Sequence, residues 1–312
     1  MIYSYAAAGF SGQLIQVECS IRRGMPHTDI VGLPDGAVKE ARERVRAVLH
    51  HCEFLYPSDR ILINLAPAGL KKSGAGFDLP IALAILLQSQ QLPAGLEELP
   101  ELLVLGELEL SGKVRGIAGA LAAVASSHEM GIEHFLVPES NLKEIESLEL
   151  RHIFTLGHIS ELPQKIEGIM QETLRQTGPS LRVPTPQNAT ENQMCEYQDE
   201  YLDFADIKGQ PLLKRAVEIA IAGRHNMLIF GPPGCGKTMI VRSVPSLFPR
   251  LSGNESVETT RIWSQAGLLR DQQTSLQFPP VRMPHHSATL EGLVGGGPQL
   301  NPGEVSLSHN GL

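Results

Sequence analysis

The sequence contains no long apolar run and no signal-like start. None of its 312 residues falls in a stretch approaching the ~18 uncharged apolar residues that a membrane-spanning helix needs. The first residues, Met1 to Tyr5, lack the order of basic then apolar residues that marks a secretion signal. These absences predict a cytoplasmic protein with no membrane partner.

Cysteine is scarce, and basic charge is not in excess. The four cysteines, Cys19, Cys52, Cys195 and Cys235, are scattered without a Cys-x-x-Cys pair, which argues against a zinc ribbon and a disulfide framework. The formal net charge of −8 argues against a protein that coats nucleic acid with its whole surface, although a local basic groove is compatible with it. Residues 1–78 carry 9 basic and 8 acidic groups, whereas residues 79–177 carry 6 and 14, so the charge is polarised.

The most informative motif is a glycine-rich run that fits the phosphate-binding pattern Gly-x4-Gly-Lys-Thr. Such a loop turns consecutive backbone N–H groups toward phosphate oxygens, its lysine reaches the outer phosphates, and its threonine hydroxyl takes a position on Mg²⁺. An apolar strand is expected just before it, over residues 226–230, and a helix just after it, over 239–247. The motif therefore predicts that the chain binds ATP with Mg²⁺ through Gly231, Pro232, Pro233, Gly234, Cys235, Gly236, Lys237 and Thr238, the last as the magnesium ligand.

The residues that normally complete an ATPase site are not found after this loop. A motor ATPase of this type needs a later strand ending in two acidic residues, which orient Mg²⁺ and water, and a distal arginine that stabilises charge in the transition state. No two acidic residues are adjacent after Thr238, and the last residues, 308–312, are expected to enter a strand. The sequence is thus expected to stop inside its ATPase domain.

The pattern of apolar residues predicts an α/β fold in two domains. Residues 1–177 form the first domain, a Pro-rich and polar stretch at 178–200 is a linker, and 201–312 form the second domain, which opens with a helix over 211–222. In the first domain, strands are expected at 2–10, 14–21, 60–65, 102–108 and 133–137, and helices at 37–51, 77–90, 117–130 and 160–176.

Besides the phosphate loop, several short stretches are distinctive: Ala7 to Phe10, Asp29 to Asp35, Ile63 to Ala68, Asp206 to Gln210, His225 to Leu228, Arg282 to His286, Gly295 to Gly297 and Pro302 to Gly311. Occurring in this one order, they resemble the ComM/YifB family of magnesium-chelatase-related AAA+ ATPases over nearly the whole chain. The resemblance implies a first domain like the C-terminal domain of Lon protease, of the ribosomal S5 domain 2 type, followed by part of an AAA+ domain. It also implies homo-oligomeric rings that act on DNA, with branch migration during natural transformation as the family's proposed role.

The same resemblance allows the peptidase site of the Lon-like fold to be checked. Lon-type peptidases use a serine in a glycine-rich turn and a lysine on a later helix. Alignment of the turn and the helix places Gly76 at the serine position and Leu121 at the lysine position. Because Ser73 with Lys71 or Lys72 on the same turn is a poor replacement, the sequence predicts no peptidase activity.

Other side chains have a functional and a structural interpretation. Arg282, His285 and His286 are expected by resemblance near the ring interior, where they could contact DNA phosphates, or they form a structural loop; a metal site with His309 matches no zinc spacing. Trp263 and Arg261 could stack on a base, but a core position is commoner. Arg42, Arg44 and Arg46 favour a solvated helix face over a nucleic-acid patch, and Asp78 is interpreted as a first-turn acid of its helix.

Two further functions stay open. A metal-chelatase motor uses the same ATPase core, although the Lon-like first domain favours the ComM type. A shortened ring partner that binds nucleotide without hydrolysing it is the other alternative.

Overall fold

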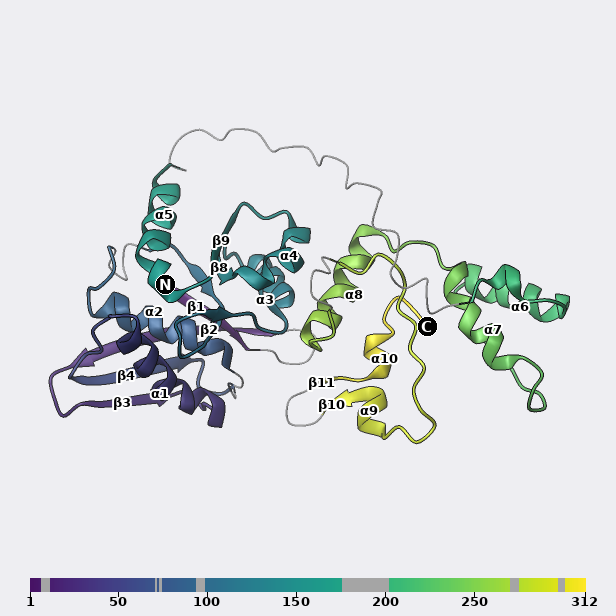
Figure 1. The fold of residues 1–312 in the computed structure, drawn as a ribbon, viewed down its shortest axis with the longest axis horizontal. Helices are drawn as coiled ribbons and strands as arrows, with labels where there is room; N and C mark the ends of the chain where they lie inside the picture. The colour runs from purple at the N-terminus through teal and green to yellow at the C-terminus, as the bar shows by residue number, and fades with distance from the viewer. Residues whose placement is uncertain are drawn as a thin grey trace. The chain divides into compact units, whose positions relative to one another are not determined.

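The computed structural model describes residues 1–6, 12–70, 72, 75–93, 99–175, 202–269, 275–296 and 301–312, so the linker predicted at 178–200 lies outside the described residues. The described residues belong to two compact units (Figure 1). The first unit is drawn from Met1–Ser180, Val257–Ser275 and Pro284–Leu307, and the second from Leu181–Ser256, Leu276–Met283 and Ser308–Leu312.

A seven-stranded mixed sheet organises the first unit, with the strand order β3-β4-β2-β1-β5-β8-β9. β1 pairs antiparallel with β2, and β2 with β4, whereas the other neighbours are parallel. The strands are β1 Ile2–Ala6, β2 Gln13–Arg22, β3 His27–Val31, β4 Arg60–Ala66, β5 Leu102–Val104, β8 His134–Pro138 and β9 His152–Leu156; β6 Glu107–Leu108 and β7 Val114–Arg115 form a separate ribbon. The predicted α/β class is confirmed.

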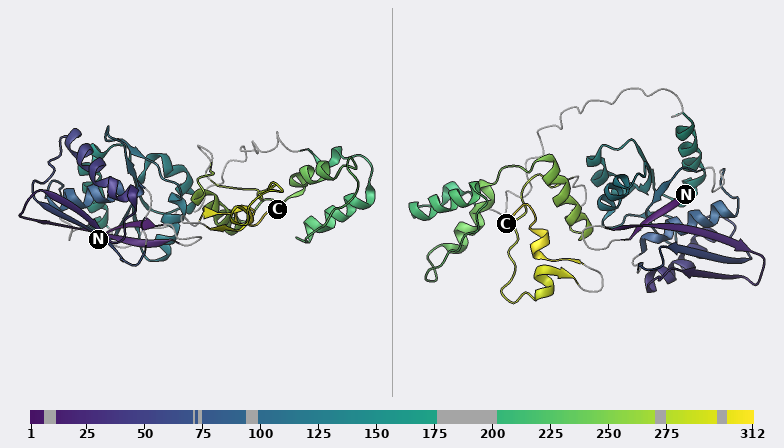
Figure 2. Two further views of the ribbon diagram at one scale, coloured as in Figure 1. Left: turned by 90° about the horizontal axis from the view of Figure 1, so that it is seen from below. Right: turned by 180° about the vertical axis from the view of Figure 1, so that it is seen from behind.

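Helices cover this sheet on both faces because its central strands are apolar on both sides (Figures 1 and 2). In β5, Leu102 and Val104 face one core and Leu103 faces the other. The first core contains residues of α1 Gly36–His51, α2 Asp78–Gln88 and α5 Leu162–Arg175, and the second contains residues of α3 Ala120–Glu129 and α4 Leu142–Ile145. α2 is buried from Asp78 to Leu87, as expected for a helix that is apolar all round.

Most of the expected elements of the first unit are present, with shorter ends. α3 begins at Ala120 rather than at 117 because Gly119, at φ 81°, precedes it in a left-handed conformation. The single strand expected over 102–108 is interrupted at Gly106, whose φ is 153°, so that β5 ends at Val104. Two strands of the seven-stranded sheet were not predicted, β3 and β9. In β3 the polar His27 and Asp29 alternate with inward residues, which obscures the apolar pattern of a strand.

The second unit is built around a small apolar core. Its elements include a 3₁₀ turn at Phe204–Asp206, α6 Pro211–Ala222, α7 Lys237–Ser243 and a 3₁₀ turn at Val244–Leu247. α6 has the predicted bounds. The core residues are Phe204, Ile207, Val217, Ile240 and Val244. The remaining α-helices and strands described in the two units are α8 Gly253–Gln265, α9 Leu290–Val294, the paired β10 Gly295–Gly296 and β11 Asn301–Pro302, and α10 Glu304–Leu307.

Two predicted strands of the second domain are wrong. Residues 226–230 have no regular secondary structure; Ile229 packs on the core, but Leu228 and Phe230 are 86% and 87% exposed. A strand exists only by pairing with a neighbour, and no described segment pairs with this one. Residues 308–312 likewise form a turn after α10 rather than a strand.

Candidate functional site

The glycine-rich loop turns sharply between the segment 226–230 and α7. Gly234 and Gly236 have φ angles of 82° and 86°, a conformation that residues with a Cβ rarely adopt. A Cβ on Gly234 would meet nothing within 4 Å, so the backbone angle and not the space requires glycine there. Gly236 precedes the first residue of α7, Lys237.

The side chain of Lys237 folds back and bonds to the backbone at the start of the loop. Its Nζ donates hydrogen bonds to the carbonyl oxygens of Gly231 (2.8 Å) and Pro232 (2.7 Å) and lies 3.6 Å from the sulfur of Cys235. Thr238 follows on the first turn of α7 with an exposed side chain. A cation folded back over a glycine-rich loop, with a hydroxyl beside it, is chemically suited to an anion such as a polyphosphate.

One further residue contacts the loop and was not predicted as a site residue. The side-chain Nε2 of Gln210 donates a hydrogen bond to the carbonyl oxygen of Cys235 at 2.8 Å. Gln210 has a positive φ of 50° and precedes Pro211, the first residue of α6. The signals in the sequence were its place in the family-like stretch Asp206 to Gln210 and directly before a helix-starting proline.

The three residues expected to contact DNA lie on exposed or half-buried segments. The rings of His285 and His286 are exposed and lie 4.1 Å apart between centroids, and His285 Nδ1 is 2.7 Å from the hydroxyl oxygen of Ser287. Arg282 is half-buried and its backbone N–H donates to the carbonyl oxygen of Leu312 at 2.7 Å. Across the part of the chain that the structure describes, no three His, Cys, Asp or Glu side chains gather in a way that could hold a metal ion.

Trp263 and Arg261 take part in packing within the first unit. Trp263 is buried and its Nε1 donates to the carbonyl oxygen of Leu307 at 2.9 Å. Arg261 Nη2 contacts Glu129 Oε1 at 2.8 Å. The core interpretation of Trp263 is therefore confirmed.

The three arginines of α1 do not all lie on a solvated face. Arg42 pairs with Glu43 at 2.9 Å and donates to the Thr28 carbonyl oxygen at 3.3 Å. Arg44, in contrast, forms two hydrogen bonds of 2.9 Å with the carboxylate of Asp78, which is completely buried. The prediction of a solvated face is thus wrong for Arg44, because its partner lies 34 residues later in the sequence.

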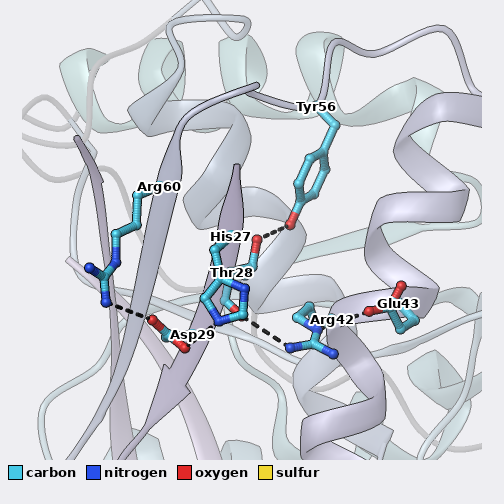
Figure 3. A network of polar contacts seen from close by, with 7 residues as sticks. All are labelled: His27, Thr28, Asp29, Arg42, Glu43, Tyr56 and Arg60. Atoms are coloured by element: carbon cyan, nitrogen blue, oxygen red, sulfur yellow. Dashed lines mark hydrogen bonds and ion pairs between the residues drawn. The ribbon is translucent and has the colours of Figure 1, made fainter. Parts of the chain in front are cut away.

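Polar contacts also line the edge strand β3 (Figure 3). Asp29 lies 2.9 Å from His27 Nε2 and accepts a hydrogen bond from Arg60 Nη2 at 3.2 Å. Thr28, whose side chain is on the other side of the strand, lies 2.8 Å from the hydroxyl of Tyr56. Because Asp29 pairs with Arg60, part of the positive charge at this edge is neutralised.

The described part of the turn that the resemblance compares with the Lon-type nucleophile contains no serine. Gly76 lies in a 3₁₀ turn, Ala75–Phe77, and Leu121 is completely buried in α3. Lys72 is also buried, and its Nζ donates to the carbonyl oxygen of Pro67; burial lowers the pKa of Lys72. Lys71 and Ser73 lie outside the described residues.

The fold and the loop are those of a magnesium-chelatase-related α/β protein. Residues 17–141 match the family described as "Subunit ChlI of Mg-chelatase", and residues 203–312 match "Magnesium chelatase, subunit ChlI". The chain is 38% identical over 312 residues to the protein YifB of Escherichia coli and 36% identical over 317 residues to the competence protein ComM of Haemophilus influenzae. It belongs to the ComM and YifB family.

The extent of these matches differs between this chain and its relatives. YifB and ComM match along 100% of this chain, but the chain spans only 58% of the length of either relative. A Lon protease of the Aster yellows witches'-broom phytoplasma is 23% identical over 173 residues, which cover 52% of this chain and 21% of the protease. Within the described residues, no helix combines the length and the apolar character needed to cross a membrane.

Proposed function

We propose that the second unit binds ATP with Mg²⁺ through residues 231–238, as the nucleotide-binding part of a cytoplasmic AAA+ motor of the ComM type. The observation that carries this proposal is the folded-back Lys237, whose Nζ is held by two loop carbonyl oxygens at 2.7 and 2.8 Å. Phosphate oxygens are stronger acceptors for an ammonium group than neutral carbonyls, so a polyphosphate would take over these contacts.

The residues present fit the nucleotide and its metal. Gly234 and Gly236 have the left-handed angles that bring backbone close to an anion. Thr238 carries the hydroxyl that would hold Mg²⁺, and the metal would neutralise charge on the outer phosphates. Lys237 would hold the same phosphates from the loop side.

A titration with a fluorescent ATP analogue tests this proposal. Lys237→Ala should abolish saturable binding of the Mg²⁺ complex, while Arg215→Ala, a change of an exposed cation on α6 (71% side-chain exposure), should leave the dissociation constant unchanged. Unchanged affinity in Lys237→Ala would refute the assignment of the loop.

We further propose DNA as the partner of the assembled protein, with Arg282, His285 and His286 as phosphate contacts and a homo-oligomeric ring as its active form. Support comes from the relationship to a competence protein and from the exposure of both histidines. Fluorescence anisotropy with labelled DNA should show weaker binding for Arg282→Ala and for the double change His285→Ala/His286→Ala. DNA affinity equal to that of the unaltered chain in both variants would remove these residues from the proposal.

The alternative is a ring partner that binds nucleotide without hydrolysing it. Steady-state phosphate release separates the two functions, since DNA-stimulated turnover that depends on Lys237 would exclude the alternative. A magnesium-chelatase motor is less favoured because of the Lon-like first domain.

A further inference from the structure

We propose that Gln210 is a positioning residue of the phosphate loop, which fixes the direction of the Gly236 backbone N–H. The inference rests on the proposed nucleotide binding and adds a residue that lies outside the eight-residue motif. Its basis is the hydrogen bond from Gln210 Nε2 to the carbonyl oxygen of Cys235, at 2.8 Å.

The geometry of one peptide unit connects this contact to the loop. The carbonyl of Cys235 and the N–H of Gly236 belong to the same peptide, and in a trans peptide these two groups point in opposite directions. Because Gln210 holds the carbonyl from one side, the Gly236 N–H is directed to the other side. Within the described residues this N–H has no hydrogen-bond acceptor, so it is available to an anion in the loop.

Gln210 is itself anchored, which allows it to act as a fixed support. Its carbonyl oxygen accepts the first hydrogen bond of α6, from the N–H of Lys214 at 3.0 Å. The Nζ of Lys214 donates to the carbonyl oxygen of Ile207 at 2.8 Å, and Ile207 is buried in the core. The backbone that carries the glutamine is thus attached to α6 and to the core.

The flexibility of Gly236 makes the orientation of this peptide depend on the hydrogen bond from Gln210. The peptide between Cys235 and Gly236 can rotate at low cost because Gly236 tolerates nearly all φ angles. Without a donor at position 210, part of the population would turn the Gly236 N–H away from the loop. The apparent affinity for the ligand falls in proportion to the fraction of molecules in the binding conformation. The contact that is lost is the one between the Gly236 N–H and a phosphate of the ligand.

The test compares isosteric and truncated variants of the full chain. Gln210→Glu keeps the shape but replaces the donor with a carboxylate, and Gln210→Ala removes the side chain. We expect both to weaken binding of Mg-ATP by about threefold to tenfold, the effect of one net hydrogen bond. Gln277→Ala, a change of another exposed glutamine of the second unit, is the matched control and should bind as the unaltered chain does. Full affinity in both position-210 variants overturns the proposal.

A pH series separates positioning from a general structural effect. As the pH falls toward 5, a growing fraction of the introduced carboxyl in Gln210→Glu becomes protonated and can donate again. Its deficit relative to the unaltered chain at the same pH should therefore shrink, whereas the deficit of Gln210→Ala should stay constant. Equal deficits of the two variants at every pH would contradict the positioning role.

An NMR measurement on the nucleotide-free chain tests the role of Gln210 even if the chain does not bind nucleotide. If the unaltered chain does not bind Mg-ATP, the proposed function fails, but the amide resonance of Gly236 in the nucleotide-free chain still reports on Gln210. That resonance should shift in Gln210→Glu and remain in place in Gln277→Ala. An unshifted Gly236 resonance overturns the positioning proposal.

Discussion

Arg44 and the buried Asp78 form a bidentate ion pair that joins α1 to the start of α2. The guanidinium Nε and Nη2 each lie 2.9 Å from a carboxylate oxygen of Asp78, and the Leu108 N–H donates to the same carboxylate at 3.2 Å. Burial raises the pKa of the Asp78 carboxyl, and the guanidinium of Arg44 counteracts this. The pair thus connects α1 to the turn Ala75–Phe77, which directly precedes α2.

Breaking this pair should strongly destabilise the first unit. Removing one partner of a buried ion pair costs about 3–5 kcal/mol because the other charge is left without compensation, so Asp78→Ala should lower the free energy of unfolding by about that amount. Urea denaturation followed by circular dichroism measures it. Arg42→Met, which breaks an exposed pair with Glu43, is the control and should cost less than about 1 kcal/mol. Equal losses in the two variants would contradict the structural role of Asp78.

The stability of the first unit should fall in mild acid because of a buried histidine, His134. His134 is 6% exposed and stacks on His152 at 5.0 Å between ring centroids. Burial, and then the charge of His152, lower the pKa of His134 below 6.5, while Glu133 and Glu172 act in the opposite direction. The unfolded chain therefore takes up this proton at a higher pH than the folded chain does.

This difference in proton uptake determines the direction in which stability changes with pH. Stability is retained above pH 6.5 and is lost as the pH falls from about 6.5 toward the lowered pKa of His134. The urea midpoint should decrease between pH 7.5 and 5, and His134→Gln should show a smaller decrease. His50→Gln, at an exposed position of α1, should follow the unaltered chain. An identical pH dependence in His134→Gln would show that other groups are responsible.

The local features of the sequence predicted much of this fold. In β4, buried Ile61, Ile63 and Leu65 alternate with more exposed residues, which is the pattern of a strand with one face in the core. α6 has the expected bounds, with Pro211 at its start and Gly223 just after its end. The phosphate loop was recognised because its glycines and its lysine are adjacent in the sequence.

Contacts between distant residues could not be predicted in the same way. Arg44 and Asp78 are 34 positions apart, and Gln210 and Cys235 are 25 apart, so only the fold brings them together. The strand expected at 226–230 was inferred from its apolar residues alone. A strand also needs a neighbouring strand to pair with, and this depends on the tertiary structure. No described segment pairs with residues 226–230, and the side chain of Phe230 is exposed.

The Lon-like turn should tolerate a serine without gaining peptidase activity. A Cβ added to Gly76 would lie 3.5 Å from the side chain of Ile117, an ordinary contact, so Gly76→Ser should change the free energy of unfolding by less than about 1 kcal/mol. Because the resemblance to Lon-type peptidases places Leu121, which is buried, at the base position, we expect the new hydroxyl to have no general base to activate it. Fluorogenic peptides and casein should not be cleaved by the unaltered chain or by the variant. Cleavage by the unaltered chain that disappears in Ser73→Ala would reveal a different nucleophile.

The rate of alkylation of Cys235 reports on ligand binding to the phosphate loop without a labelled nucleotide. The sulfur of Cys235 lies 3.6 Å from Lys237 Nζ and is partly exposed. Burial raises the pKa of Cys19 to about 12 and also raises that of Cys52, so these two thiols should react slowly near neutral pH. Iodoacetamide should therefore modify Cys235 faster than Cys19 and Cys52, as measured by peptide mass spectrometry.

If the loop holds phosphates, Mg-ATP should slow this alkylation, because the ligand covers the loop and draws Lys237 away from the sulfur. With the nucleotide at 100 times its dissociation constant, the rate at Cys235 should fall by up to about a hundredfold, since only the free fraction of the protein reacts. The protection should disappear in Lys237→Ala, and the rate at Cys52, on the first unit, should be the same with and without nucleotide. Protection that persists in Lys237→Ala would show that nucleotide binding does not depend on Lys237, and equal slowing at Cys52 would indicate a general effect of the nucleotide on the reagent.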